Sequence, residues 1–399
     1  MTTTFLHLPN EVLVIILGNL YLFSEHLDIY GDKADIFSIR LVCKRLAELG
    51  TSLAFKSVKF VQHKEGFQRL LEFSRSSFHK YVRRLVCSCC DYSQHLTTNI
   101  RIFTNEFNLT NLKKSIREEL FQKYCLGRRF QESLEANDLD ITNLASAIHQ
   151  FKRLRSVEII QDWSPKWYEK LEDAELNNFA ASPTIHRLFE AVASALASSE
   201  ANIEALTLGT RHRDIPPLLG IFHGLSPKKF RLYETAFRSV KILNLRLSWW
   251  EPDHNNINFE GISALIRSSP LEELYLKMST GAALPRSFLH SLELPCLKIL
   301  KLTRVPFRKP SDLLQFLYKY SATLKIVEFR DLSLEKGSWV TVFTGMRNNL
   351  VLDRCSLRPT FWVGTSFEFG KQYRKPGFSH QMISDFVRRK TDVNPFSQL

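Results

Sequence analysis

Four closely spaced residues near the end of the first quarter of the chain are of types that bind zinc: Cys87, Cys89, Cys90 and His95. Zinc prefers thiolate and imidazole ligands in tetrahedral sets, and structural sites usually contain a Cys-x-x-Cys pair. That pair is missing here, and Cys87 falls at a position that should point into an apolar core. We therefore expect these residues to pack and not to hold a metal ion.

The sequence also lacks a convincing motif for phosphate binding or catalysis. Gly364 to Lys371 has the outline of a phosphate-binding loop, but five residues separate its glycines where four are needed, and Gln372 replaces the required Ser or Thr. The sequence contains no His-Glu-x-x-His, Gly-x-Ser-x-Gly or paired-glycine dinucleotide motif. Its twelve histidines form no pairing that indicates a catalytic base. The sequence predicts a protein without catalytic residues, metal or cofactor.

Composition and length describe a folded, basic chain. The 399 residues include 54 basic and 41 acidic side chains, and 44% of residues are hydrophobic, which is too apolar for a disordered chain. One compact core rarely exceeds about 300 residues, so we expect several domains or an elongated repeat architecture. The first sixty residues hold six bases and six acids, so the whole surplus of +13 lies beyond them. A basic surplus favours an acidic protein partner or a nucleic acid.

No membrane partner is expected. The most apolar stretch, Val12 to Phe23, is interrupted by Gly18 and Asn19 and is shorter than the roughly 20 residues of a membrane span. The amino terminus lacks the features of a secretory signal, and seven scattered cysteines suit reduced thiols. We expect a protein of the cytoplasm, the nucleus or both.

Two short amphipathic helices are predicted at the amino terminus. The first begins at Leu8-Pro9-Asn10-Glu11, because proline and an acid suit the first turn of a helix. The second is predicted from Asp35 through Leu49. Both carry more apolar residues than a hairpin of this size can bury, so they need a partner. The alternative is an ordinary helical hairpin that packs on its own domain.

These residues resemble an F-box, the segment that docks on the Skp-type adaptor of cullin–RING ubiquitin ligases. The resemblance rests on Leu8-Pro9-x-Glu11-Val12-Leu13, Ile16-Leu17-x-x-Leu20, Asp35-Ile36 and Arg40-Leu41-Val42-Cys43-Lys44-Arg45-Leu46. The chain departs from the usual motif in the long connection from Tyr21 to Ala34. The resemblance implies an adaptor, and through it a cullin, as partners. It implies these adaptor contacts: Leu8, Pro9, Ile16, Leu20, Ile39, Val42, Cys43 and Leu46.

From residue 55 onward one pattern recurs, apolar-x-x-apolar-x-apolar. Eight copies begin at Phe55, Val82, Leu154, Ile203, Val240, Leu271, Leu297 and Leu324, and a degenerate ninth has Arg347 before Leu350 and Leu352. The last intervals, 26, 27 and 23 residues, approach those of leucine-rich repeats, in which a short strand alternates inward and outward side chains. The alternative is an ordinary α/β sheet.

Helices are expected between these strands. They are predicted at Thr184–Ser199, Phe259–Ser268 and Ser311–Tyr320, with a mainly helical insertion at Asn111–Phe151 and a loop at Trp163–Phe179. We predict an α/β chain made of a helical F-box (residues 1–54), an irregular leucine-rich-repeat-like solenoid (55–358), and a carboxy-terminal cap and tail (359–399). A short helix near Ile383 and Phe386 would cap the last repeat. Nuclear import is the alternative role of the adjacent Arg388-Arg389-Lys390.

Outward positions of the strands provide a candidate surface for a target protein. Arg246, Lys277, Lys301 and Arg330 come from four consecutive copies, and Trp249, Trp250 and Tyr275 flank them. Arginine and lysine in such a stripe suit carboxylates or phosphates, whereas the alternative is a solvated charged surface. We therefore expect the substrate receptor of a cullin–RING ligase, with an acidic or phosphorylated target. The alternatives are an adaptor-bound scaffold or trafficking protein outside a cullin complex, a nucleic-acid binder without a recognisable module, or an unrecognised enzyme.

Overall fold

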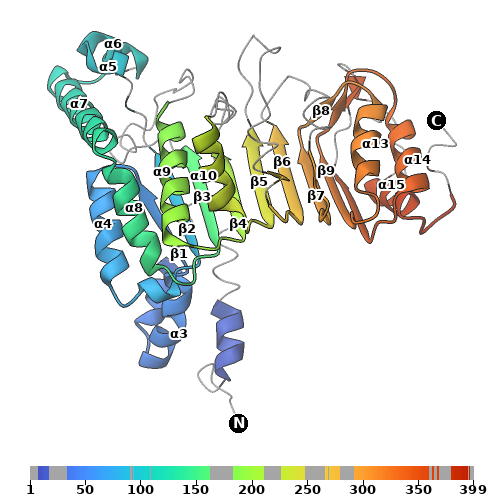
Figure 1. Cartoon of the computed structure of the whole chain (residues 1–399), viewed down its shortest axis with the longest axis horizontal. Coiled ribbons are helices and arrows are strands. Elements are labelled where there is room, and N and C mark those ends of the chain that lie inside the picture. Colours follow the sequence, from blue (N-terminus) through green and yellow to red (C-terminus); the bar gives the residue numbers. More distant parts are fainter. Residues whose placement is uncertain are drawn as a thin grey trace.

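The computed structural model describes residues 8–17, 34–89, 92, 94–107, 109–161, 183–210, 226–247, 266–267, 269–278, 292–358, 362–363, 366–367, 379–393 and 395. These residues form a small helical module at the amino terminus and a long parallel sheet covered by helices (Figure 1). The predicted α/β class is confirmed.

The main sheet has nine strands, and their order in space follows the order of the chain. Every neighbouring pair is parallel. Each strand therefore contacts only its sequence neighbours, which is the arrangement of a repeat protein. The strands are β1 (Ser57–Val61), β2 (Arg84–Cys89), β3 (Ser156–Gln161), β4 (Ala205–Thr210), β5 (Ile242–Leu247), β6 (Glu273–Met278), β7 (Ile299–Thr303), β9 (Ile326–Arg330) and β11 (Arg354–Arg358).

The predicted repeats are in register. The middle residue of each of the eight full copies lies directly opposite the middle residue of the next, from Val58 opposite Leu85 to Leu300 opposite Val327. Side chains alternate between the two sides of a strand, so this register puts one apolar row on the side that faces the helices. That row belongs to the large buried cluster of the sheet and its helices.

The prediction for the ninth copy is wrong. Strand β11 begins after Leu352, and Cys355 occupies the middle position opposite Val327. The true copy is Leu352-x-x-Cys355-x-Leu357, at 28 residues from the preceding copy, and its first leucine was counted as the last residue of an earlier copy. Burial raises the pKa of the Cys355 thiol to about 12, so this side chain packs as a small neutral apolar group.

Helices cover one side of the sheet (Figure 1). The predictions for Thr184–Ser199 and Ser311–Tyr320 are confirmed by α9 and α13, whereas only two residues of Phe259–Ser268 are described, both helical. Together with the strands these helices bury the main core. They are α4 (Lys64–Arg75), α8 (Leu139–Gln150), α9 (Pro183–Ser199), α10 (Pro227–Phe237), α13 (Pro310–Lys319), α14 (Trp339–Asn349) and α15 (His380–Val387).

The predicted helical insertion at Asn111–Phe151 is confirmed by α7 (Lys114–Ala136) and α8, and two short helices before it, α5 (Gln94–Thr97) and α6 (Ile100–Glu106), were not predicted. The three helices α5, α6 and α7 form a unit of their own between β2 and β3. Their buried side chains, which include Phe103 and Tyr124, make a second hydrophobic cluster separate from the main core. The predicted loop at Trp163–Phe179 lies outside the described residues.

Short elements complete the fold. The 3-10 helix η2 (His79–Tyr81) precedes β2. A small second sheet joins β8 (Pro306–Phe307), β10 (Ser333–Leu334), β12 (Trp362–Val363) and β13 (Ser366–Phe367) in the order β13-β12-β10-β8. Across the described part of the chain, no helix combines the length and apolar character needed to cross a membrane.

Two arginines tie the last two helices together at their carboxyl ends. The Arg347 guanidinium, at the end of α14, donates to the Phe386 carbonyl (2.5 Å) and the Thr391 carbonyl (2.8 Å) beyond α15. Arg389 in turn donates to the Arg347 carbonyl (2.8 Å) and the Asn348 carbonyl (3.1 Å). Each arginine therefore satisfies carbonyls that the neighbouring helix leaves open. The middle residue of the basic triplet at 388–390 thus has a structural role.

We expect Arg347→Ala to loosen this cap. Hydrogen bonds from a charged group contribute about 1.5–3 kcal/mol each, so the local opening free energy of α15 should fall by about 2 kcal/mol. Hydrogen exchange of the α15 amides measures this quantity. The exposed Lys390→Ala is the control, because the side chain is on the surface. Unchanged protection of α15 in Arg347→Ala would contradict the capping role.

Candidate functional site

The helical module at the amino terminus is held together by Arg45. Its described helices are residues 10–17, α2 (Ala34–Arg40) and α3 (Lys44–Ala54). The Arg45 guanidinium, in the first turn of α3, donates to Asn10 Oδ1 and to the Leu8 carbonyl, both at 2.7 Å. The start of the first helix is therefore fixed against the start of α3, although 35 residues separate the partners.

The predicted helix from Asp35 to Leu49 is broken into two. A turn at Leu41–Cys43 separates α2 from α3, and Cys43 has an extended backbone (φ −159°, ψ 163°). No glycine or proline marks this turn, so the helical periodicity on either side concealed it. The break leaves Leu41 and Val42 at the corner between the two helices, with 88% and 66% of their surface exposed.

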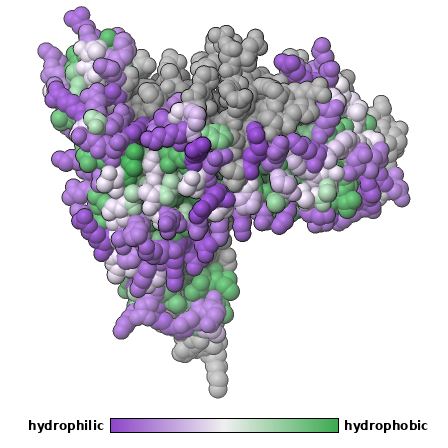
Figure 2. Space-filling model, in the orientation of Figure 1, coloured by the Kyte–Doolittle hydropathy of each residue, from purple (hydrophilic) through white to green (hydrophobic). Residues whose placement is uncertain are grey.

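Exposed apolar side chains concentrate on this module. Among the described residues, twelve large hydrophobic side chains are exposed, and half of them belong to the module. Figure 2 shows apolar surface on the part of the molecule that projects below the sheet. Apolar side chains in such numbers on a small unit mark an interaction site. We call this set the corner surface: Val12, Val14, Ile15, Phe37, Leu41 and Val42.

The structure distributes the predicted adaptor contacts over several environments. Pro9 and Val42 are exposed, whereas Leu8, Ile16, Ile39 and Cys43 are half-buried. Leu46 is only 2% exposed, so it supports the interior of the module instead of offering a contact. Leu20 lies outside the described residues. Ile15 and Leu41, which were not among the predicted contacts, are exposed.

Aromatic rings connect the module to the first repeat. Phe55, directly after α3, stacks on Phe78 (4.3 Å between ring centroids) and packs against Phe73 of α4 (5.7 Å) and Phe37 of α2 (6.2 Å). The Arg40 guanidinium lies 5.2 Å from the centre of the Phe55 ring. Such ring contacts add to ordinary burial. The module therefore packs directly on the solenoid.

The second candidate surface is the side of the sheet that faces away from the helices. On β5, β6, β7, β9 and β11 its residues align in three rows across the strands. The first outward row is Ile242, Glu273, Ile299, Ile326 and Arg354. The second is Asn244, Tyr275, Lys301, Glu328 and Ser356, and the third is Arg246, Lys277, Thr303 and Arg330.

The predicted basic stripe is divided between two of these rows. Arg246, Lys277 and Arg330 share the third row, whereas Lys301 lies in the second. Its ammonium is 3.6 Å from a Glu328 carboxylate oxygen, and Arg354 approaches the other oxygen of that carboxylate at 3.3 Å. Tyr275 stands beside Lys301 in the second row.

Arg354 of β11 also belongs to this charged surface. It was not predicted, because the ninth strand was placed too early in the sequence. Trp249 and Trp250 lie outside the described residues.

Most of the charged outward residues lie on the carboxy-terminal strands of the sheet. On β2 and β3 the outward residues Val86, Ser88, Glu158 and Ile160 are all buried. The Glu158 carboxylate, 5% exposed, is 2.5 Å from the Arg84 guanidinium, which neutralises it. These four positions are unavailable to a partner in this structure. Lys59 of β1 is exposed, but most of the accessible charged outward side chains lie on β5 and the strands after it.

The cysteine cluster offers no assembled metal site in the part of the chain that is described. Cys87 and Cys89 are fully buried, His95 is exposed, and Cys90 lies outside the described residues. Burial raises the pKa of the Cys87 thiol. Across the described ranges, no group of three or more His, Cys, Asp or Glu side chains could hold a metal ion.

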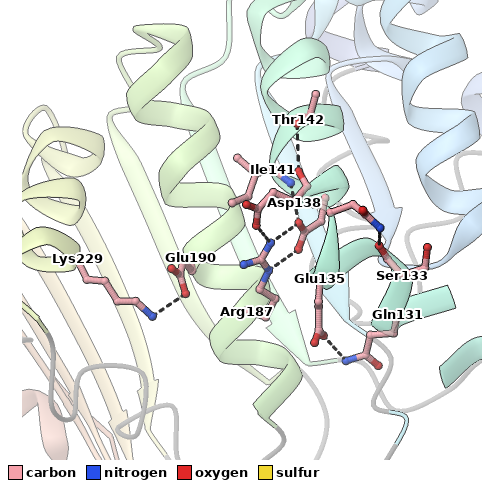
Figure 3. A network of polar contacts seen from close by, with 11 residues as sticks. Gln131, Ser133, Glu135, Asp138, Ile141, Thr142, Arg187, Glu190 and Lys229 are labelled. Atoms are coloured by element: carbon pink, nitrogen blue, oxygen red, sulfur yellow. Dashed lines mark hydrogen bonds and ion pairs between the residues drawn. The ribbon is translucent and has the colours of Figure 1, made fainter. Parts of the chain in front are cut away.

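A buried ion pair lies between α8 and α9 (Figure 3). Arg187 of α9 donates from Nε to Asp140 Oδ2 (2.8 Å) and from a terminal nitrogen to Asp140 Oδ1 (2.7 Å) and Asp138 Oδ1 (2.6 Å). Asp140 is completely buried. The hydrogen bond to Asp140 raises the pKa of Arg187 further above its usual range. The contact therefore joins α8 to α9, and we assign it a structural role.

Comparisons with known proteins give little beyond the fold. No protein-family model matches the chain, and no curated protein is similar to it. Among solved structures, the leucine-rich repeat-containing protein LegL7 from Legionella pneumophila is similar over 84% of this chain and 99% of its own, with 12% sequence identity and a TM-score of 0.36.

Proposed function

We propose that this protein is the substrate-receptor subunit of a cullin–RING ubiquitin ligase of the SCF type. The corner surface would dock on a Skp-type adaptor, and the repeats would hold a target protein. The observation that carries the proposal is the concentration of exposed apolar side chains on a small helical module. The sequence of that module resembles an F-box, whose known partner is such an adaptor.

The contribution of this subunit would be positioning. The described residues contain an apolar surface at one end and a charged sheet surface further along the chain, with packed rings between the module and the first repeat. A subunit that binds two partners at once raises the effective concentration of one near the other without performing chemistry. Catalysis would belong to a ubiquitin-charged enzyme elsewhere in the assembly.

Charge at the corner should abolish docking. We expect Leu41→Asp with Val42→Asp to reduce capture of both adaptor and cullin at least about tenfold, because desolvating two carboxylates in an apolar interface costs several kcal/mol. Co-purification from cells with the tagged full chain measures this capture. Leu126→Asp with Leu139→Asp is the matched control, because these exposed leucines lie outside the module.

The outcomes separate the candidate functions. Equal recovery of adaptor from the wild type and both double variants would overturn the docking proposal. Adaptor captured through the corner without any cullin would assign the protein to a scaffold or trafficking role outside a ligase.

A further inference from the structure

The accessible sheet surface is strongly basic. Its five strands place five basic side chains and two acidic ones at described outward positions, the acids being Glu273 and Glu328. Glu328 lies within 4 Å of both Lys301 and Arg354, so its charge is compensated within the second and first rows. In the third row Arg330 lies 3.6 Å from the Asp331 carboxylate, so Arg246, Lys277 and Arg330 are three bases beside one acid. The row keeps a net positive charge that favours an acidic partner.

A glycine shapes one end of the third row. Gly209 of β4 has a φ of +149°, and a Cβ atom there would lie 2.3 Å from the Cβ of Arg246. The stem of Arg246 therefore occupies the space that any other residue at 209 would fill. Arg246 thus lies close against β4. On one side of it are the buried outward positions of β2 and β3, and on the other are the accessible ones of the later strands.

The first row gives the same surface an apolar margin. Three of its five residues are the isoleucines at 242, 299 and 326, of which Ile299 and Ile326 are direct neighbours, and Ile242 is 39% exposed. A strand rises about 3.3 Å per residue, so the first and third rows each lie about 7 Å from the second row. An extended chain along the second row would send alternate side chains toward the two margins, one apolar and one basic.

We propose that this surface binds an extended protein segment in which acidic and aliphatic residues alternate. The segment lies across the strands along the second row, with its carboxylates toward Arg246, Lys277 and Arg330 and its aliphatic side chains toward the isoleucines. Neighbouring strands are about 4.8 Å apart, so the span from Arg246 to Arg330 is about 14 Å, enough for four or five extended residues.

A protein segment suits this surface better than a nucleic acid. Glu273, Glu328 and Asp331 are interspersed among the bases, so the positive charge is confined to a short stretch and does not form the long continuous track that a phosphate backbone needs. The one aromatic residue among the described outward positions of these strands is Tyr275, whose hydroxyl lies 3.5 Å from Thr303. Stacking of successive bases needs several aromatic rings, so that mode of binding lacks a platform here.

This inference deepens the proposed function by naming the class of target, and it can be tested without the adaptor. The probes are three fluorescent eight-residue peptides. The first alternates Asp and Ile, the second has Asn in place of each Asp, and the third has the same residues as the first in two blocks, one of Asp and one of Ile. Fluorescence anisotropy with the purified full chain measures binding. We expect the alternating acidic peptide to bind at least about tenfold tighter than the Asn peptide and tighter than the block peptide.

Variants locate the binding. Lys277→Glu with Arg330→Glu should weaken the alternating peptide at least about tenfold, whereas Lys228→Glu with Arg231→Glu, the same charge change on exposed positions of α10, should leave it unchanged. If the charge-reversal variant Lys277→Glu with Arg330→Glu does not fold, the neutral variant Lys277→Gln with Arg330→Gln takes its place and should also weaken peptide binding. The corner variant Leu41→Asp with Val42→Asp should bind the peptide normally.

Several results would overturn the inference. They are absence of binding, equal binding of the Asp and Asn peptides, and equal losses in the two charge-reversal pairs. A single-stranded oligonucleotide that binds tighter than the peptide through Lys277 and Arg330 would assign the surface to nucleic acid. If the wild-type chain captures the adaptor but does not bind the peptide, this inference alone is refuted. If it binds the peptide but does not capture the adaptor, only the proposed docking is refuted.

Discussion

Arg187→Met is expected to lower the free energy of unfolding by about 3–5 kcal/mol, because it leaves a completely buried carboxylate without its counter-ion. Asp140 has no exposed surface, and Arg187 makes two hydrogen bonds to it. After the substitution, the Ile141 amide at 2.9 Å remains as a hydrogen-bond donor to Asp140. Urea unfolding followed by circular dichroism measures the loss.

A neighbouring pair provides the matched control. Lys229 and Glu190 form an ion pair at 2.9 Å on the same group of helices, but their side chains are 45% and 25% exposed. Lys229→Met should therefore cost less than about 1 kcal/mol. The double variant Arg187→Met with Asp140→Leu should recover most of the loss, because an apolar pair replaces a buried ionic one at little cost. Equal losses in Arg187→Met and Lys229→Met would contradict this account.

Gly66→Ala is expected to destabilise the protein by at least about 3 kcal/mol, although alanine is the better helix former. Gly66 lies in the first turn of α4, and a Cβ atom there would lie 1.9 Å from the Val61 carbonyl oxygen at the end of β1. That oxygen belongs to the backbone, so relief requires α4 to move away from the sheet. The change in urea midpoint measures the effect.

Gly345→Ala is the control for this substitution. Gly345 is also helical, in α14, but its nearest neighbours are the ends of the Leu314 and Tyr318 side chains at 2.7 Å. Side chains can turn aside, and the helix propensity of alanine offsets part of the remaining cost. We expect a loss of about 1 kcal/mol or less. A loss at position 66 as small as that at position 345 would show that α4 is free to shift.

The repeat strands could be predicted because a buried strand imposes a strict alternation on its residues. The same rule failed at β11, where a cysteine fills an apolar position and the next aliphatic residues, Leu350 and Leu352, lie before the strand. The alternation alone also did not show that the four bases of the predicted stripe belong to two rows. Lys301 follows its middle leucine by one residue and Lys277 by three, which places them in different rows once the register is known.

The candidate surfaces were less accessible to sequence reasoning. The turn at Leu41–Cys43 has no glycine or proline, so the most exposed apolar residues of the module were assigned to a helix. Leu46 is buried by tertiary packing within the module, and helical periodicity alone cannot show which apolar residues are buried in this way. The ion pair of Arg187 with Asp140 joins two helices across 47 positions of the sequence, and no local pattern predicts such a contact.

The separate core of the helical insertion has a consequence for how the chain folds. Most strands of the sheet pair with a neighbour reached through a short connection, but β3 must find β2 across residues 90–155. Closing a long flexible loop costs entropy before any contact compensates for it. Because α5, α6 and α7 have their own buried cluster, they can form first and shorten the search. We therefore expect the insertion to set the rate at which β1 and β2 join the other seven strands of the sheet.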